Sequence, residues 1–368
     1  MTKATSLTKI ASQKFKKNFW GVFSLSFLTI CCLLAIFAYG LAPDKSKNAN
    51  NIILSIHSKP PRFEVPVLTI PYGNTSTSGK LKEFFFGKQI TANSIALKEY
   101  RLLENGIEVE EYSDATQQGI TTFYALDNFP DATTAEEIPQ KYIKNQKYIL
   151  GTDKHGRDLL SRMLIGARIS LSIGFVAVII SVIIGISLGA IAGYFGGKID
   201  AFIMWLINVT WSIPTLLLVI AVTLALGKGF WQVFIAVGLT MWVEVARVVR
   251  GQVMGVKNMQ FVTAARAMGY KDYRIISKHI LPNVLAPVIV ISAANFASAI
   301  LIESGLSFLG IGAQSPIPSW GGMIKDHYHY IILGKPYLAI IPGLAIMSVV
   351  MAFILLGNAL RDALDVKN

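Results

Sequence analysis

The stretch Phe261–Asn283 reads FVTAARAMGYKDYRIISKHILPN and lies between apolar runs that are each long enough to cross a bilayer. Its first part has the i, i+3, i+4, i+7 spacing of one narrow helical face, formed by Phe261, Ala264, Ala265 and Met268. Four basic residues lie within this stretch: Arg266, Lys271, Arg274 and Lys278. The pattern predicts a basic helical segment that lies flat either on a partner protein or on lipid headgroups.

A corner is predicted in the middle of this stretch. Gly269 marks the end of the first helix, because glycine readily takes the left-handed conformation of a helix stop. Asp272 is expected to cap a second helix, and Pro282 is expected to end it. The apolar stripe of that second helix has three predicted members: Tyr273, Ile276 and Ile280. The stretch is therefore interpreted as two short amphipathic helices joined at a turn.

The spacing of small residues, glycine and a Leu-Pro pair resembles the EAA loop of ABC-importer permeases. The matching residues are Ala264, Ala265, Gly269, Leu281 and Pro282. The segment HILPN at 279–283 resembles the dipeptide and oligopeptide branch, specifically its C-type permease subunit. In that family the ATPase subunits act on this loop, so the resemblance implies a coupling role for these residues, Arg266 and His279. Thr263 stands where the family usually has Glu, and no contact of that Glu is implied here.

Composition restricts the class of protein. Of 368 residues, 53% are hydrophobic and 15% charged, with a mean hydropathy of +0.50, which fits only a polytopic membrane protein. The net charge of +12 is explained by basic residues beside membrane helices, and no nucleic-acid partner is expected. Cys31 and Cys32 are adjacent in an apolar run, so no structural disulfide is predicted.

Six apolar runs predict six membrane spans, at 19–42, 169–195, 201–226, 230–249, 284–309 and 337–360. The predicted fold class is an all-α polytopic membrane protein, and the resemblance implies the type I ABC-importer permease fold. Small residues recur at every fourth position of the second run, at Ser181, Gly185, Gly189 and Gly193. This face is expected to pack against another helix.

The chain is expected to divide into four parts: a cytoplasmic tail at 1–18, the first span at 19–42, an extracytoplasmic domain at 43–150 and the permease core at 151–368, which includes the coupling loop at 255–283. Five lysines in the tail favour a cytoplasmic N-terminus, and six spans then place the C-terminus on the same side. The region 43–150 contains strand-like alternation and a hairpin signal at Asn105-Gly106. It is either a loop that caps the transporter or a platform for a binding protein or partner permease.

The motif GTDxxGRD lies at the start of the core and again resembles the peptide-importer permeases. Its members are Gly151, Thr152, Asp153, Gly156, Arg157 and Asp158. The charged members and Arg162 are predicted to form an ion-pair network that holds a helix at the membrane surface. A catalytic role of His155 with Asp153 or Asp158 is the less favoured alternative, since no nucleophile or metal spacing accompanies them.

Three polar or helix-breaking residues within the spans are candidates for the translocation path: Pro214, Asn295 and Glu303. Pro214 is either a tolerated kink or a hinge. Glu303 lies late in its span, where the cost of a charge is lower than at the centre. The segment DHYH at 326–329 is predicted to be an interfacial loop, because His at i and i+2 is poor metal-binding geometry on a helix.

These patterns and the resemblance predict a permease that moves dipeptides or oligopeptides across a bacterial inner membrane. No P-loop motif occurs in the sequence, so the chain is not expected to be an enzyme, and it should bind no cofactor or metal itself. ATP and Mg²⁺ belong to its expected partners, which are two ATPase subunits, a second homologous permease, an extracytoplasmic binding protein and lipid. The alternatives are a permease for nickel or another small solute and a self-contained secondary transporter. A secondary transporter should carry coupling carboxylates in several helices, and Glu303 is the one candidate in the sequence.

Overall fold

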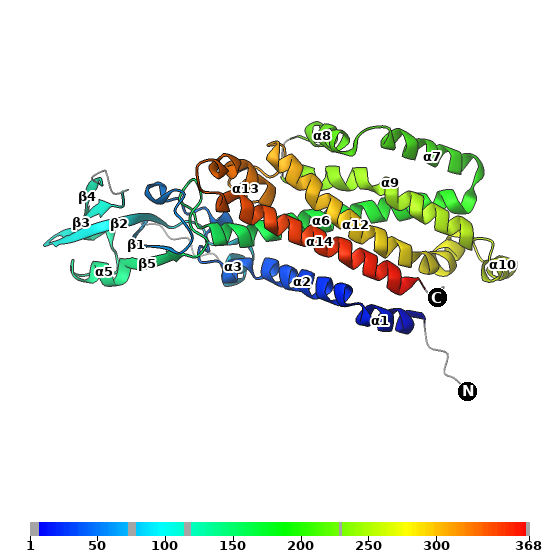
Figure 1. Ribbon diagram of the computed structural model, residues 1–368, viewed down its shortest axis with the longest axis horizontal. Coiled ribbons are helices and arrows are strands. Elements are labelled where there is room, and N and C mark those ends of the chain that lie inside the picture. The colour runs from blue at the N-terminus through cyan, green and yellow to red at the C-terminus, as the bar shows by residue number, and fades with distance from the viewer. Residues whose placement is uncertain (1–6, 73–78, 114–118, 228–229, 366–368) are drawn as a thin grey trace. The chain divides into compact units, whose positions relative to one another are not determined.

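The computed structural model describes residues 7–72, 79–113, 119–227 and 230–365 (Figure 1). The chain divides into two compact units. The first, called the helical unit here, comprises Met1–Cys32, Ser170–Gln314 and Leu344–Asn368. The second, called the mixed unit, comprises Leu33–Ile169 and Ser315–Gly343.

The helical unit holds all or part of the long apolar helices. Its elements are α1 (Leu7–Lys17), α2 (Phe19–Ile36), α6 (Leu159–Phe195), α7 (Gly197–Trp211), α8 (Thr215–Ala225), α9 (Phe230–Val256), α10 (Gln260–Ala267), α11 (Asp272–Ile275), α12 (Leu281–Phe308) and α14 (Tyr337–Leu364). Five helices in the described residues are long and apolar enough to cross a membrane. The protein is therefore a polytopic helical membrane protein.

The region predicted as one span at 201–226 is broken. α7 and α8 meet at an angle of 94°, and counting this bent pair as one span brings the total to six. Pro214 precedes α8 with the extended ψ of 127°. Because proline has no N–H and disfavours helix before it, the chain turns sharply here where only a bend was predicted. The first predicted span is also interrupted: α2 ends at Ile36, and α3 (Ala38–Leu41) follows a break at Phe37.

The small-residue face of α6 packs against α9, as predicted. A Cβ on Gly185 would lie 2.5 Å from a Val245 carbon, and one on Gly189 would lie 2.5 Å from the Ala246 carbonyl oxygen. Only glycine permits this approach, and the two helices are in close backbone contact as a result.

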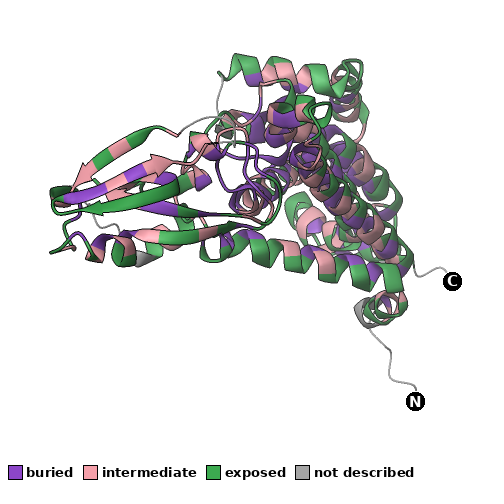
Figure 2. Ribbon diagram, turned by 60° about the vertical axis from the view of Figure 1, so that its left-hand side comes forward, coloured by how far each residue is buried: buried purple, intermediate pink, exposed green. Residues whose placement is uncertain are grey.

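The mixed unit contains a five-stranded antiparallel sheet in the order β4-β3-β2-β1-β5. Its strands are β1 (Phe63–Pro71), β2 (Ala92–Leu103), β3 (Gly106–Glu111), β4 (Thr121–Ala125) and β5 (Ile143–Tyr148). Apolar side chains on one face, such as Leu68, Leu97 and Ile107, pack with Ile138 of α5 (Glu137–Tyr142). Figure 2 shows buried positions of these strands in purple. The unit also contains α4 (Lys80–Phe86) and α13 (Trp320–His327).

The hairpin between β2 and β3 forms where the sequence indicated, but its loop is displaced by one residue. Leu103 pairs with Gly106, so the loop is Glu104-Asn105. A Cβ on Gly106 would lie 2.2 Å from the carbonyl oxygen of Tyr124 in β4. Gly106 is thus required for close approach of the neighbouring strand, and it does not serve as a turn residue.

Candidate functional site: coupling corner and membrane pocket

Residues 259–280 form the connection between α9 and α12, called the coupling corner here. α10 ends at Ala267, and Gly269 has a φ of +75°, which confirms its predicted left-handed conformation. The Gly269 N–H donates to the Arg266 carbonyl at 2.9 Å, and the Tyr270 N–H donates to the Ala265 carbonyl at 3.2 Å. These two bonds form a Schellman motif, which fixes the direction in which the chain leaves the helix.

One side of the coupling corner belongs to the core. Its buried residues are Val262, Ala265, Ile275 and Ile280, which pack with the ends of α6, α9 and α12. The other side is open: Phe261, Ala264 and Met268 are exposed, and Tyr273 is 82% exposed. The predicted narrow face of α10 is therefore divided, because Ala265 anchors the corner while the other three residues form an exposed face.

Two details of the second predicted helix are wrong. Asp272 is the first residue of α11 and does not cap it, since Lys271 occupies the cap position without a side-chain bond. The Asp272 carboxylate instead accepts a hydrogen bond from the hydroxyl of Tyr194 in α6. Of the predicted apolar stripe, Ile280 is fully buried and Ile276 packs against the core, but Tyr273 is exposed and Ile275 is buried instead. The spacing of apolar residues along a helix does not show which of them face the core and which face a partner protein.

Pro282 does not end the second helix as predicted. A π-helical turn at Ile276–Ile280 continues directly into α12, and Pro282 lies in the first turn of that helix. Proline donates no N–H to the preceding turn, and the π-helical turn with its wider hydrogen bonding lies directly before it. Leu281 and Pro282 thus join the coupling corner rigidly to a membrane-spanning helix.

Aromatic and basic side chains stiffen the coupling corner. The Arg266 guanidinium lies 5.8 Å from the ring centre of Tyr194, and Arg274 lies 4.3 Å from that of Tyr270. His279 stacks on Tyr270 with ring centres 5.8 Å apart. The predicted coupling residues are therefore all within one connected segment.

Charged bonds also tie α7 and α6 to the end of α9. Arg250 binds the Asp200 carboxylate through two hydrogen bonds, of which the one from Nη2 to Oδ2 measures 2.6 Å. Lys257 Nζ donates to the Gly193 carbonyl at 2.9 Å. α6, α9 and α12 therefore pack against the coupling corner, and α7 is held to α9 beside it.

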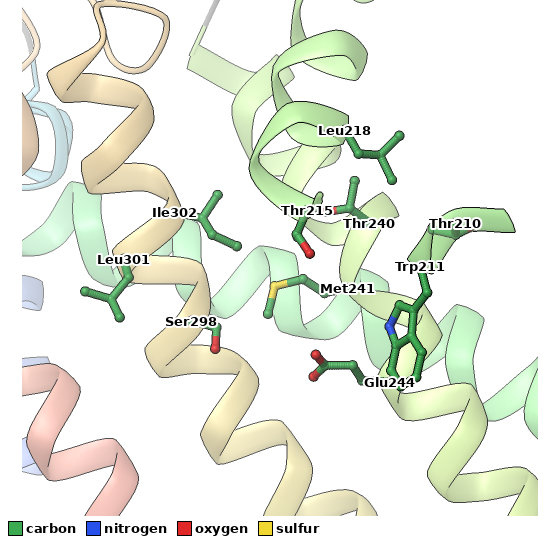
Figure 3. A pocket seen from close by; sticks show the side chains of 10 residues that line it. All are labelled: Thr210, Trp211, Thr215, Leu218, Thr240, Met241, Glu244, Ser298, Leu301 and Ile302. Carbon is green, nitrogen blue, oxygen red and sulfur yellow. The ribbon is translucent and has the colours of Figure 1, made fainter. Parts of the chain in front are cut away.

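A pocket of about 310 Å³ lies in the helical unit, lined by α7, α8, α9 and α12 (Figure 3). Trp211 and Thr215, on either side of the break at Pro214, both line it. Thr240 and Glu244 of α9 and Ser298 of α12 add polar groups. The sharp turn between α7 and α8 thus shapes the pocket, although the Pro214 side chain itself is not part of the lining.

The three predicted path residues do not meet in this pocket. Asn295 is buried in α12, and its amide has no hydrogen-bond partner in the described residues. Glu303 is fully buried and accepts hydrogen bonds from Ser307 Oγ at 2.6 Å and Ser170 Oγ at 3.5 Å. Glu244, which was not among the predicted path residues, lies near the middle of the helix Trp231–Val256 and lines the pocket.

The GTDxxGRD motif is a buried structural cluster in the mixed unit. Asp153 Oδ2 lies 2.7 Å from Arg157 Nε and 3.4 Å from Arg162 Nε, and all three side chains are buried. Burial favours the neutral Asp153 carboxyl, but the two guanidinium groups outweigh it and hold its pKa below the usual value. Thr152 Oγ1 accepts from the Lys59 N–H at 2.8 Å. The motif thereby links the start of α6 to residues preceding the sheet.

The fourth predicted member of this network behaves differently. Asp158 accepts from the Ser161 N–H at 2.8 Å and caps α6, and no ion pair joins it to an arginine in the described chain. Gly151 and Gly156 have positive φ, and a Cβ on Gly156 would lie 1.8 Å from the Ile53 carbonyl oxygen. Glycine is therefore needed at both positions, because the backbone takes a left-handed conformation there.

The predicted interfacial loop at 326–329 is a helix end. His327 is the last residue of α13, is buried, and accepts a hydrogen bond at Nε2 from the Lys154 N–H at 3.3 Å. Asp326 pairs with Lys154 Nζ at 2.9 Å. Burial lowers the pKa of His327 below its ordinary value, so the imidazole is neutral at physiological pH.

The chain is similar in sequence to known membrane transport proteins. The profile of the family "binding-protein-dependent transport system inner membrane component" matches residues 185–367. A dipeptide transport system permease protein of Alkalihalophilus pseudofirmus is 39% identical, over 67% of this chain and 83% of the relative. A glutathione transport system permease protein of Pectobacterium atrosepticum is 39% identical, over 66% and 79%. An oligopeptide transport system permease protein of Haemophilus influenzae is 42% identical, over 60% and 71%.

The helical architecture and these similarities define a multi-pass inner-membrane permease subunit of an ABC importer. The chain belongs to the family of binding-protein-dependent transport system inner membrane components. The resemblance to peptide-importer permeases noted at the coupling corner is confirmed.

Proposed function

We propose that this chain is one of two homologous permease subunits of an importer for short peptides, and that two ATPase subunits act on its coupling corner. One observation carries the proposal: α9 and α12 both line the pocket and both end in the coupling corner. A displacement of the corner is transmitted along two packed helices to the pocket walls. The relatives named for dipeptides, oligopeptides and glutathione support a peptide substrate.

The exposed face of the coupling corner supports ATPase docking. Phe261, Ala264, Met268 and Tyr273 are all exposed in this short connection between two membrane helices, and exposed apolar patches mark protein interaction sites. ATP and Mg²⁺ are then held by the partner subunits. In this arrangement the bent pair α7–α8 counts as the sixth span, and the corner and both chain ends face the cytoplasm.

Uptake by a purified importer tests the proposal. The complex of both permeases, the ATPases and the binding protein is reconstituted in proteoliposomes, with the binding protein and a labelled dipeptide on one side and ATP on the other. We expect accumulation of the peptide that requires both ATP and this chain. Accumulation that proceeds without ATP, or ATP-driven uptake of other solutes but no peptide, would contradict it.

The domain at 43–150 is proposed to lie outside and to contact the binding protein or the partner permease. Val65 of β1 pairs with Gln146 of β5, so residues 66–145 can be replaced by an Asn-Gly turn that joins the two strands. This deletion keeps residues 53–59, which contact the GTDxxGRD motif. We expect the ATPases to co-purify as before, while binding-protein-dependent uptake falls several-fold. Unchanged uptake would contradict a role in binding and would show that this domain only caps the transporter.

A further inference from the structure

Glu244 occupies an unusual position for a carboxylate. It lies near the middle of the membrane-spanning helix Trp231–Val256, and its exposed side chain points into the pocket (Figure 3). Within the described residues no hydrogen bond or ion pair reaches it. Ionisable groups inside membrane spans face a bundle interior or a water-filled path and mark the route of a substrate or ion. Among the described residues, Glu244 is thus a carboxylate that faces the pocket without a paired cation.

A candidate cation on the same helix, Arg247, is directed toward α7. Arg247 lies one helical turn after Glu244, at a spacing where opposite charges on a helix commonly pair. Its guanidinium instead lies 3.7 Å from the ring centre of Trp211, and Nη2 is 3.4 Å from Asn208 Oδ1. Because the guanidinium is held against α7, the carboxylate stays open to the pocket.

The other polar groups that line the pocket are hydroxyls and the Trp211 indole N–H. Thr240 shares its helix, Thr215 comes from α8, and Ser298 lies across the pocket on α12 (Figure 3). A single carboxylate with neutral hydroxyls suits a monovalent cation with several N–H donors. A divalent metal ion prefers several oxygen ligands with more negative charge, and the remaining lining, which includes Met241 and Leu301, does not supply them.

We infer that Glu244 binds the protonated α-amino group of the peptide during its passage, with the neighbouring hydroxyls accepting its other N–H bonds. This inference rests on the proposed function. The α-amino group of a peptide has a pKa of about 7.7–8.0 and is mostly protonated at neutral pH. An ammonium group entering a membrane needs an anionic partner, and Glu244 supplies one in a pocket between membrane-spanning helices.

The first test is uptake by the reconstituted importer with Glu244→Gln. We expect at least a tenfold lower rate for a dipeptide with a free amino group, a smaller loss for Glu244→Asp, and no change for the control Asp362→Asn at the exposed end of α14. Both permeases and the ATPases should co-purify with every variant. Loss of a subunit with Glu244→Gln would show that the residue pairs with a partner chain, which overturns the inference.

A cross-linking test reads the orientation of the peptide directly. Ser298→Cys is placed in a chain lacking Cys31 and Cys32, and the importer is supplied with tripeptides that carry a thiol-reactive side chain at the first or the last residue. We expect faster labelling from the first residue, and loss of that preference when Glu244→Gln is added. Equal labelling from both ends with Glu244 present would contradict the inference. Absence of peptide uptake by the unmodified importer would instead contradict the proposed function.

Discussion

Replacement of Gly269 by valine is expected to yield an importer that assembles and hydrolyses ATP but moves several-fold less peptide per ATP. Gly269 has a φ of +75°, which a β-branched residue adopts only with strain of about 1–3 kcal/mol. A Cβ at this position would meet nothing within 4 Å, so the effect comes from the backbone and not from a clash. The strain is too small to unfold the protein, but it distorts the Schellman motif that orients the exposed face of the coupling corner.

The matched control is Gly269→Asn, because asparagine tolerates the left-handed conformation. We expect it to couple nearly normally. Ala264→Asp should also lower the coupling ratio, since Ala264 is exposed and an added charge there hinders only a partner surface. Peptide uptake and phosphate release are measured together in proteoliposomes, with subunit stoichiometry determined on the same samples. Equal coupling in the valine and asparagine variants would show that the conformation of this turn is unimportant.

Asp153→Asn is expected to destabilise the mixed unit by about 3–5 kcal/mol, because it leaves Arg157 and Arg162 buried without their anion. Asparagine keeps the shape and an acceptor for the Arg157 N–H, so the change isolates the charge. The control is Glu64→Gln, whose exposed ion pair with Lys147 contributes about 0–1 kcal/mol. Thermal unfolding of the detergent-solubilised protein measures both.

The pH dependence of this effect has a definite sign. The pKa of Asp153 is lower in the folded protein than in the unfolded chain, so the carboxylate contributes stability above its unfolded pKa of about 3.9. That contribution is lost only as pH falls further, through the folded pKa. Between pH 5 and 7 the difference in stability between wild type and Asp153→Asn should therefore stay constant. A difference that disappears by pH 5 would mean that the carboxylate is not held by the two arginines.

Local features with a strong steric or hydropathy signal were predictable from the sequence. The left-handed turn at Gly269 and the packing face of α6 follow from the properties of glycine alone. Features that depend on how neighbouring helices pack were not predictable from the sequence. Ile275 and not Tyr273 enters the core because α11 docks on the ends of α9 and α12, a rotation that periodicity does not encode. The break at Pro214 was visible as a proline, but its 94° angle was not.

The polar sites show the same division. The charged residues of GTDxxGRD predicted a network, yet whether Asp158 pairs or caps depended on where α6 begins, which is ten residues before the predicted span. Glu244 gave no signal as a pocket residue, because the span that contains it continues to Val256 instead of ending at Val249. The shorter predicted span thus placed Glu244 near the end of a helix in which it occupies the middle.

The claim that the ATPases act on the coupling corner is tested most directly by site-directed cross-linking. Single cysteines are introduced at Met268, on the exposed face, and at Asn105, in the β2–β3 loop, in a chain lacking Cys31 and Cys32. In the assembled importer we predict that Met268→Cys cross-links to an ATPase subunit through a short bifunctional reagent, in a manner that changes with ATP. Asn105→Cys should react instead with an impermeant reagent from the opposite side of the membrane. Cross-linking of the ATPase to Asn105→Cys, or its absence at Met268→Cys in a complex that transports peptide, would contradict this account.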